Sequence, residues 1–235
     1  MKLAIMQPYF LPYVGYYQLI AAADVFVVYD NIKYTKKGWI NRNRMLLNGT
    51  SAIFTLPLKK GSDSLNVVER ELAAEFDRSK LLNQLRSGYS RAPQFELTYP
   101  IIEQIVLNGE SNLFRYIHQS IMRLCDHLSI NTKVMISSEI TIDHQLKGQD
   151  KVLALCQAVG ADTYINTIGG VELYSKDAFL KNGIDLRFIK TQLFEYSQFT
   201  AKFVPSLSIL DVLMFNPVDW ISNKGLFAYE LIESS

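Results

Sequence analysis

The chain alternates short apolar runs with longer segments whose apolar residues repeat at helical spacing. The runs at residues 3–6 and 25–29 have the length and the β-branched and aromatic content of buried strands. The segment between them contains Pro8, Pro12 and Gly15, and its apolar spacing suits a helix. This order predicts a β-loop-α-β unit whose two loops face one crevice at the carboxyl ends of the strands. A bare crossover that carries basic residues is the alternative interpretation.

Within residues 40–58, the dipeptide Asn48-Gly49 separates two strand-like segments. Both residues tolerate positive φ, so the dipeptide is a strong signal for a β-hairpin. On the first hairpin strand, Arg42 and Arg44 alternate with asparagines and therefore point to the same face. Two guanidinium groups on one face can bind phosphate or carboxylate oxygens, and we expect neither arginine to be needed for folding. A solvated face at a sheet edge is the alternative.

The middle and C-terminal parts of the chain show two further patterns. Helical spacing at residues 77–87 and 100–128 predicts a helical insertion at about residues 70–130. Beyond it, strands alternate again with helices, at residues 133–137, 150–159, 163–166, 174–182 and 184–189. An irregular, aromatic segment then leads to a helix capped by Ser206 or Ser208, and the remainder is expected to form one short helix.

Alternation at both ends of the chain predicts an α/β fold, a Rossmann-like, mostly parallel sheet with a β-hairpin and a helical insertion. We expect residues 1–235 to form a single domain. The critical feature is parallel pairing of the two N-terminal runs, because antiparallel pairing would exclude this fold.

The composition is that of a globular protein, with 49% hydrophobic residues and a net charge of +1. The near-neutral net charge argues against a polycation that binds nucleic acid. Charge is nevertheless unevenly distributed, because no acidic residue occurs between Asn31 and Ser62. This segment is expected to form an anion-attracting surface through Lys33, Lys36, Lys37, Arg42, Arg44, Lys59 and Lys60.

The sequence gives no sign of a metal site or a membrane segment. Cys125 and Cys156 lie in apolar helical patterns without metal-ligand spacing, which predicts reduced core thiols, and no metal is expected. Proline breaks the apolar N-terminal segment, and no stretch is long enough to span a bilayer without proline or charge. We expect a cytoplasmic protein without a membrane partner, and the cofactor remains unknown.

Glycines at two places invite a phosphate-binding interpretation. Gly148 precedes a predicted helix, and Gly169-Gly170 follows a predicted strand, so either backbone could approach a phosphate. Neither segment matches a Walker or GxGxxG pattern, and turn glycines are the simpler interpretation.

Five segments together resemble the WbqC-like protein family: MQPYFLPYVGYYQLI, DNIKYTKKGWINRNR, KGQDK, YINTIGGVELY and FVPSLSILDVL. That family is associated with bacterial gene clusters for O-antigen, a part of lipopolysaccharide, and for other surface polysaccharides. The resemblance implies a cellular process rather than a reaction. A weaker resemblance links the first turn to nucleotidylyltransferases and pantothenate synthetases, in which a His-x-Gly-His helix start contacts a triphosphate. Tyr13 and Tyr16 replace both histidines here.

The leading hypothesis is an enzyme that acts on a nucleotide-linked amino sugar by acyl or amino-acyl transfer, forming an amide. We expect Asp30 and Lys37 to be catalytic, with Asp30 as the general base for the sugar ammonium. Expected substrate-binding residues are Gln7, Tyr13, Tyr16, Asn31, Lys36, Trp39, Asn41, Arg42 and Arg44. If both loops lie at strand ends, then Gln7, Tyr13, Asp30 and Lys37 line one pocket.

Two other functions remain open. One is a non-catalytic protein that binds a nucleotide or a sugar phosphate, and the other is a nucleotidylyltransferase-like enzyme. Nucleic-acid binding through the basic hairpin is disfavoured by the net charge. The expected partner is a small molecule, most simply a nucleotide-linked sugar. The sequence leaves the oligomeric state open, a homo-oligomer included.

Overall fold

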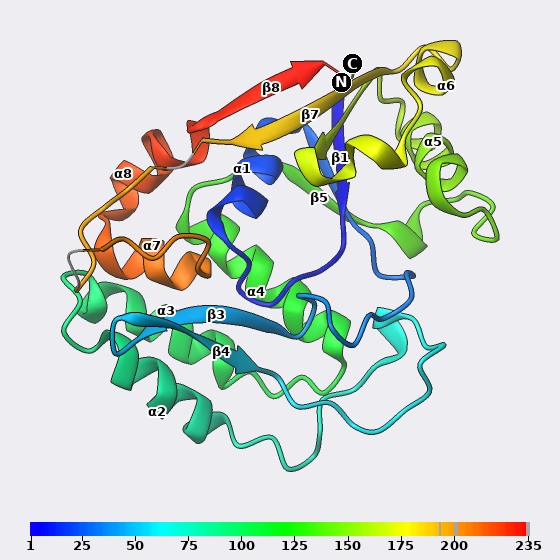
Figure 1. Ribbon diagram of the computed structural model, residues 1–235. Coiled ribbons are helices and arrows are strands. Elements are labelled where there is room, and N and C mark those ends of the chain that lie inside the picture. Colours follow the sequence, from blue (N-terminus) through cyan, green and yellow to red (C-terminus); the bar gives the residue numbers. More distant parts are fainter. Residues whose placement is uncertain (193, 200–201, 234–235) are drawn as a thin grey trace.

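The computed structural model describes residues 1–192, 194–199 and 202–233, and it contains a six-stranded sheet (Figure 1). The strand order is β5 (Lys133–Ile136), β2 (Val25–Val28), β1 (Lys2–Met6), β6 (Thr163–Thr167), β7 (Asp185–Thr191) and β8 (Tyr229–Glu233). All neighbours are parallel except β7 and β8. Leu3 pairs with Val25 and Met6 with Val28, so the predicted parallel β-loop-α-β unit is confirmed.

Alternating residues of the strands enter two separate cores, one on each face of the sheet. Leu3 and Ile5 pack in the core that contains residues of α5 (Gly148–Val159) and α6 (Lys176–Lys181). Ala4 belongs to the other core, with α1 (Val14–Ala22) and the helical insertion. The two-residue period of the strands therefore places helices on both faces, as the mostly parallel sheet requires.

A hairpin and three helices occupy the long interval between β2 and β5. Asn48 and Gly49, with φ of 51° and 75°, connect β3 (Arg42–Leu47) to β4 (Thr50–Thr55), so the predicted hairpin is confirmed. The helices are α2 (Arg78–Tyr89), α3 (Phe95–Val106) and α4 (Leu113–His127). Asn112 caps α4 by accepting a hydrogen bond from the Arg115 amide at 3.0 Å.

The C-terminal segment contains one element that the sequence pattern does not predict. Ser208 caps α7 (Ile209–Phe215), and α8 (Val218–Asn223) follows, as expected for the end of the chain. The sheet then gains β8, whose residues are mostly exposed and carry no clear apolar alternation. An exposed edge strand gives a weak sequence signal because it buries little apolar surface.

No described helix combines the length and the apolar content that crossing a bilayer requires.

The packing of α2 on the hairpin leaves no room for a side chain at Gly88. A Cβ there would lie 2.5 Å from Met45 Cε and 2.7 Å from the Leu46 carbonyl oxygen. We expect Gly88→Ala to lower the free energy of unfolding by about 1–3 kcal/mol, because this clash with backbone exceeds the gain in helix propensity of roughly 1 kcal/mol. Chemical denaturation measures the difference.

Gly109→Ala is the matched control, since nothing lies within 4 Å of a Cβ at that position. Equal stability of the Gly88→Ala and wild-type proteins would contradict the close approach of α2 to β3.

Candidate functional site

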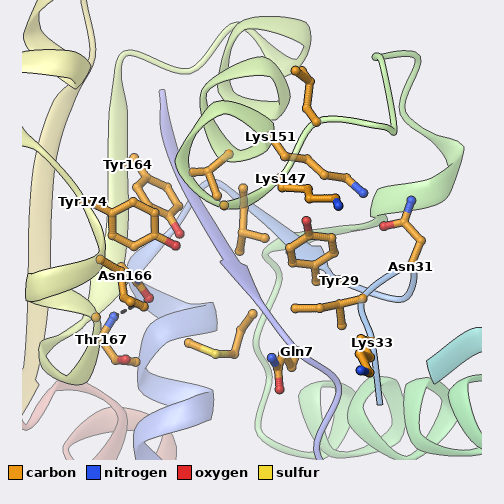
Figure 2. Close-up of a pocket in the computed structure, with 18 of the residues that line it drawn as sticks. Gln7, Tyr29, Asn31, Lys33, Lys147, Lys151, Tyr164, Asn166, Thr167 and Tyr174 are labelled. Carbon is orange, nitrogen blue, oxygen red and sulfur yellow. Dashed lines mark hydrogen bonds between the residues drawn. The ribbon is translucent and has the colours of Figure 1, made fainter. Parts of the chain in front are cut away.

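The principal cavity lies at the carboxyl ends of β1, β2 and β6 and has a volume of about 820 Å³ (Figure 2). From β1 the sheet continues to β2 on one side and to β6 on the other, so the strand order reverses at this point. Crevices at such reversals are the usual ligand sites of open α/β sheets. We call this cavity the first cavity. Its polar and aromatic lining includes Gln7, Tyr9, Tyr29, Asn31, Lys33, Asn66, His144, Lys147, Lys151, Tyr164, Asn166, Thr167 and Tyr174.

The charged groups of the first cavity are all basic. Lys33, Lys147 and Lys151 line it together with His144, and none of the described lining residues is an aspartate or glutamate. Such a lining attracts an anion, because no carboxylate in the cavity competes for the ammonium groups.

Lys151 is the most deeply placed of these cations, with 4% of its surface exposed. Its Nζ donates a long hydrogen bond of 3.4 Å to the His144 carbonyl and lies 5.2 Å from the centre of the Tyr29 ring. Burial lowers the pKa of Lys151, and the nearby Asp30 carboxylate acts in the opposite direction. The amine therefore has weak partners within the protein and is available to a ligand.

The N-terminus of α5 also borders the first cavity. Lys147 is its N-cap and makes no side-chain capping bond, so side chains leave the first amide groups of the helix uncapped there. Gly148 has φ of 52°, and nothing lies within 4 Å of a Cβ built on it. Open space beside free amide groups at a helix N-terminus permits close approach of a phosphate. Gly170 differs, because a Cβ there would lie 2.5 Å from Asn166 Nδ2, so its role is close packing.

Asp30 is buried, with 1% of its surface exposed, and is not among the residues that line the first cavity. Its Oδ1 accepts hydrogen bonds from Ser137 Oγ at 2.7 Å and from the Ser138 amide at 2.9 Å. Its Oδ2 accepts one from Ser138 Oγ at 2.6 Å. These contacts tie the end of β2 to the end of β5, and no described cavity-lining atom belongs to Asp30.

A chain of polar contacts runs from Asp30 to the first cavity. Ser137 Oγ lies 2.7 Å from Asp30 Oδ1 and 2.8 Å from the side-chain oxygen position of Asn31, whose nitrogen position is 3.0 Å from His144 Nδ1. The single hydroxyl proton of Ser137 cannot serve both acceptors. Reversing the Asn31 amide gives each contact one proton: His144 Nδ1–H to Asn31, Asn31 to Ser137, and Ser137 to Asp30. In this assignment His144 Nε2 carries a free lone pair.

A second cavity, of about 350 Å³, lies beside the first. Tyr9 lines both cavities. The other residues of the second cavity are Pro12, Tyr13, Trp39, Asn43, Arg44 and Ser206. The guanidinium of Arg44 lies 4.7 Å from the centre of the Trp39 ring.

The structure divides the expected site residues between these cavities and the core. Gln7 and Asn31 line the first cavity, whereas Tyr13, Trp39 and Arg44 line the second. Tyr16 and Asn41 are buried. The Tyr16 hydroxyl donates to the Gln7 carbonyl at 3.0 Å, and Asn41 accepts from the Tyr34 hydroxyl at 2.8 Å.

The expected common pocket for Gln7, Tyr13, Asp30 and Lys37 is therefore not found. After Gln7 the chain turns away from the sheet, since the Phe10 amide donates to the Ile40 carbonyl at 2.9 Å. This contact carries Tyr13 to the second cavity, and Lys37 is exposed on the loop before β3.

The basic segment between Asn31 and Ser62 is also less available than the sequence indicates. Lys36 forms an ion pair with Asp63 at 2.7 Å, just beyond the acid-free segment. Arg42 donates to the Gly38 carbonyl at 2.9 Å and to the Lys37 carbonyl, so it holds its own loop. The expectation that Arg42 is dispensable for folding is therefore revised.

Sequence reasoning missed the basic residues of the first cavity that come from the second half of the chain. Lys147 and Lys151 stand in the KGQDK segment, and Asn166 and Tyr174 in the YINTIGGVELY segment. Both segments contributed to the family resemblance, and their glycines indicated places where the backbone could approach a phosphate. The missing information was that β6 lies next to β1, which only the sheet order supplies.

Comparisons with known proteins extend over most of the chain. An uncharacterized protein of Mycobacterium tuberculosis, Rv1507c, is 28% identical over 220 residues, which cover 92% of this chain and 93% of that protein. No solved structure matches the chain. The model of the WbqC-like protein family matches residues 7–223, and the chain belongs to that family.

Proposed function

We propose that the protein binds a nucleotide-linked amino sugar in the first cavity and transfers an acyl or amino-acyl group to the sugar amine. Membership of the WbqC-like family supports a general role related to surface polysaccharides. The observation that carries the proposal is the first cavity itself. It combines three lysines with a helix N-terminus at the reversal point of the sheet, and its described lining residues include no carboxylate.

The cavity chemistry fits a diphosphate with a flat group and a sugar attached. Lys147, Lys151 and the uncapped amides of α5 supply donors for phosphate oxygens. Tyr29 and Tyr174 supply aromatic surface for a base or a sugar ring. The amides of Gln7, Asn31 and Asn166 suit sugar hydroxyls. A volume of about 820 Å³ is large enough for such a molecule.

His144 is the general base of this proposal. The sugar ammonium must lose a proton before its nitrogen attacks the acyl carbonyl, and the free lone pair on His144 Nε2 can accept it. As the amide bond forms, the bond between the acyl carbon and the donor's leaving group breaks. The leaving group departs with the proton that His144 took up, and the second proton of the nitrogen goes to solvent. Asn31, Ser137 and Asp30 fix the imidazole in this tautomer through the chain of contacts described above. Asp30 thus takes part as a positioning residue rather than as the base.

A non-catalytic role in binding a nucleotide or sugar phosphate is the second candidate. Two observations favour it. Both oxygens of the Asp30 carboxylate already accept hydrogen bonds from the protein, and the described residues of the first cavity include no carboxylate. Steady-state turnover of UDP-glucosamine with acyl donors separates the two functions.

The adenylyl-transfer alternative loses support, because Tyr16 is 2% exposed and its hydroxyl is hydrogen-bonded to the Gln7 carbonyl.

We expect UDP-glucosamine and UDP to raise the melting temperature and uridine to leave it unchanged, because the diphosphate makes the decisive contacts. Lys147→Ala and Lys151→Met should each weaken UDP binding, measured by calorimetry, by roughly ten- to a hundredfold. Lys60→Gln, which removes an exposed charge outside the first cavity, is the control. Uridine binding as tight as UDP binding would refute a diphosphate site.

Lys151→Met should also raise the melting temperature of the ligand-free protein. Burial lowers the pKa of Lys151 below its usual 10.5, so the folded state holds this proton less tightly than the unfolded chain. Its destabilising contribution is fully present below the folded-state pKa and disappears as the pH rises toward 10.5. Methionine keeps the apolar stem and removes that cost. Stability should therefore rise while UDP affinity falls, and a parallel loss of both would contradict the assignment.

The tautomer of His144 can be measured directly by nitrogen NMR of the neutral imidazole. We expect the proton on Nδ1 and the lone pair on Nε2. Ser137→Ala removes the hydroxyl that orients Asn31 and should shift the population toward the Nε2–H form. His127, at the end of α4, has no electrostatic contribution from Asp30 and is the internal reference, which should not change. A wild-type Nε2–H tautomer would exclude His144 as the base in this geometry.

A further inference from the structure

The second cavity has a chemistry of its own. Among the lining residues that the structure describes, Arg44 is the one charged group, and the remaining polar lining comes from Tyr9, Tyr13, Asn43 and Ser206. Trp39 forms an aromatic wall and is 37% exposed. At about 350 Å³ the second cavity is near the lower limit for small-molecule sites.

Arg42 and Arg44 stand two residues apart on β3, and both lie against Trp39, yet their donors are used differently. Arg42 is committed to the carbonyls of Gly38 and Lys37. Within the described residues, the Arg44 guanidinium makes no hydrogen bond or ion pair, and its protein contact is the Trp39 ring at 4.7 Å. A guanidinium that rests on an aromatic ring without a hydrogen-bond partner keeps its N–H donors free for a planar, forked acceptor.

The number of charges in the second cavity identifies the kind of anion. A diphosphate calls for several cations, and the first cavity offers three lysines and a helix N-terminus. The second cavity offers one guanidinium, which matches one negative charge and the planar geometry of a carboxylate.

We propose that the second cavity binds the carboxylate of a co-substrate, with Arg44 gripping both oxygens and Trp39 covering a flat group next to them. Tyr9 belongs to both cavities, so the co-substrate lies beside the nucleotide sugar. The role as co-substrate rests on the proposed function, in which an acyl or amino-acyl donor must reach the sugar amine. The carboxylate held by Arg44 is a recognition group of that donor and does not react. The reacting carbonyl is a separate group of the donor that carries its own leaving group. Binding of a carboxylate to Arg44 can be tested without it.

The test uses benzoate as the probe, with phenyl phosphate as its counterpart, followed by NMR titration of the full-length protein. We expect Arg44→Gln to weaken benzoate binding by roughly tenfold or more. The variant should fold, because the backbone of Arg44 keeps its bonds to Asn43 Oδ1 at 2.8 Å and to the Ser208 amide at 2.9 Å. Arg42→Lys is the structural counterpart and should lower the melting temperature, which Arg44→Gln should not.

Lys60→Gln removes one exposed positive charge outside both cavities and should leave benzoate binding unchanged. UDP-glucosamine affinity is measured on the same proteins and should not respond to Arg44→Gln. Two results overturn the inference: benzoate binding that survives Arg44→Gln, or phenyl phosphate binding that is lost in Arg44→Gln and is tighter than that of benzoate. If benzoate binds through Arg44 while UDP-glucosamine does not bind, the carboxylate site stands and the proposed function fails.

Discussion

Burial of the loop after β1 constrains the whole carboxyl edge of the sheet. Phe10 and Leu11 are fully buried, so their backbone groups need partners within the protein. Asn43 Nδ2 donates to the Leu11 carbonyl at 2.9 Å, and Ser208 Oγ donates to the same oxygen at 2.6 Å. One buried carbonyl thereby joins the loop after β1, the hairpin and the start of α7. These bonds hold the loop that carries Tyr9, which lines both cavities.

The fold followed from local patterns wherever burial was strong. Parallel β1 and β2, the hairpin at Asn48 and Gly49 and the three inserted helices each bury an apolar face, so periodicity located them. The strand β8 was missed because it lies at an edge and is largely exposed. Strand order could not be predicted from local sequence patterns either, since it depends on which apolar faces meet in three dimensions.

The candidate site was predictable only where its residues lie next to a strand in sequence. Gln7 directly follows β1, Asn31 lies shortly after the end of β2, and both line the first cavity. Lys147 and His144 come from a loop more than a hundred residues later, so no local pattern connects them to Gln7. The acid-free basic segment was predicted to be an available anion-attracting surface, but its sequence does not show which partners its lysines find in the fold. The partner of Lys36 is Asp63, one residue beyond the end of the segment.

The long interval between β2 and β5 has a consequence for how the protein folds. These adjacent strands pair from Val25–Lys133 to Val28–Ile136, with the hairpin and three helices between them in sequence. Their pairing closes a loop of about a hundred residues. Closing this loop costs conformational entropy before the strand contacts can stabilise the fold. The inserted helices rest on local contacts and form faster. We therefore expect docking of β5 onto β2 to come late in folding, and the hydrogen bonds of Asp30 that join the ends of these strands to form with it.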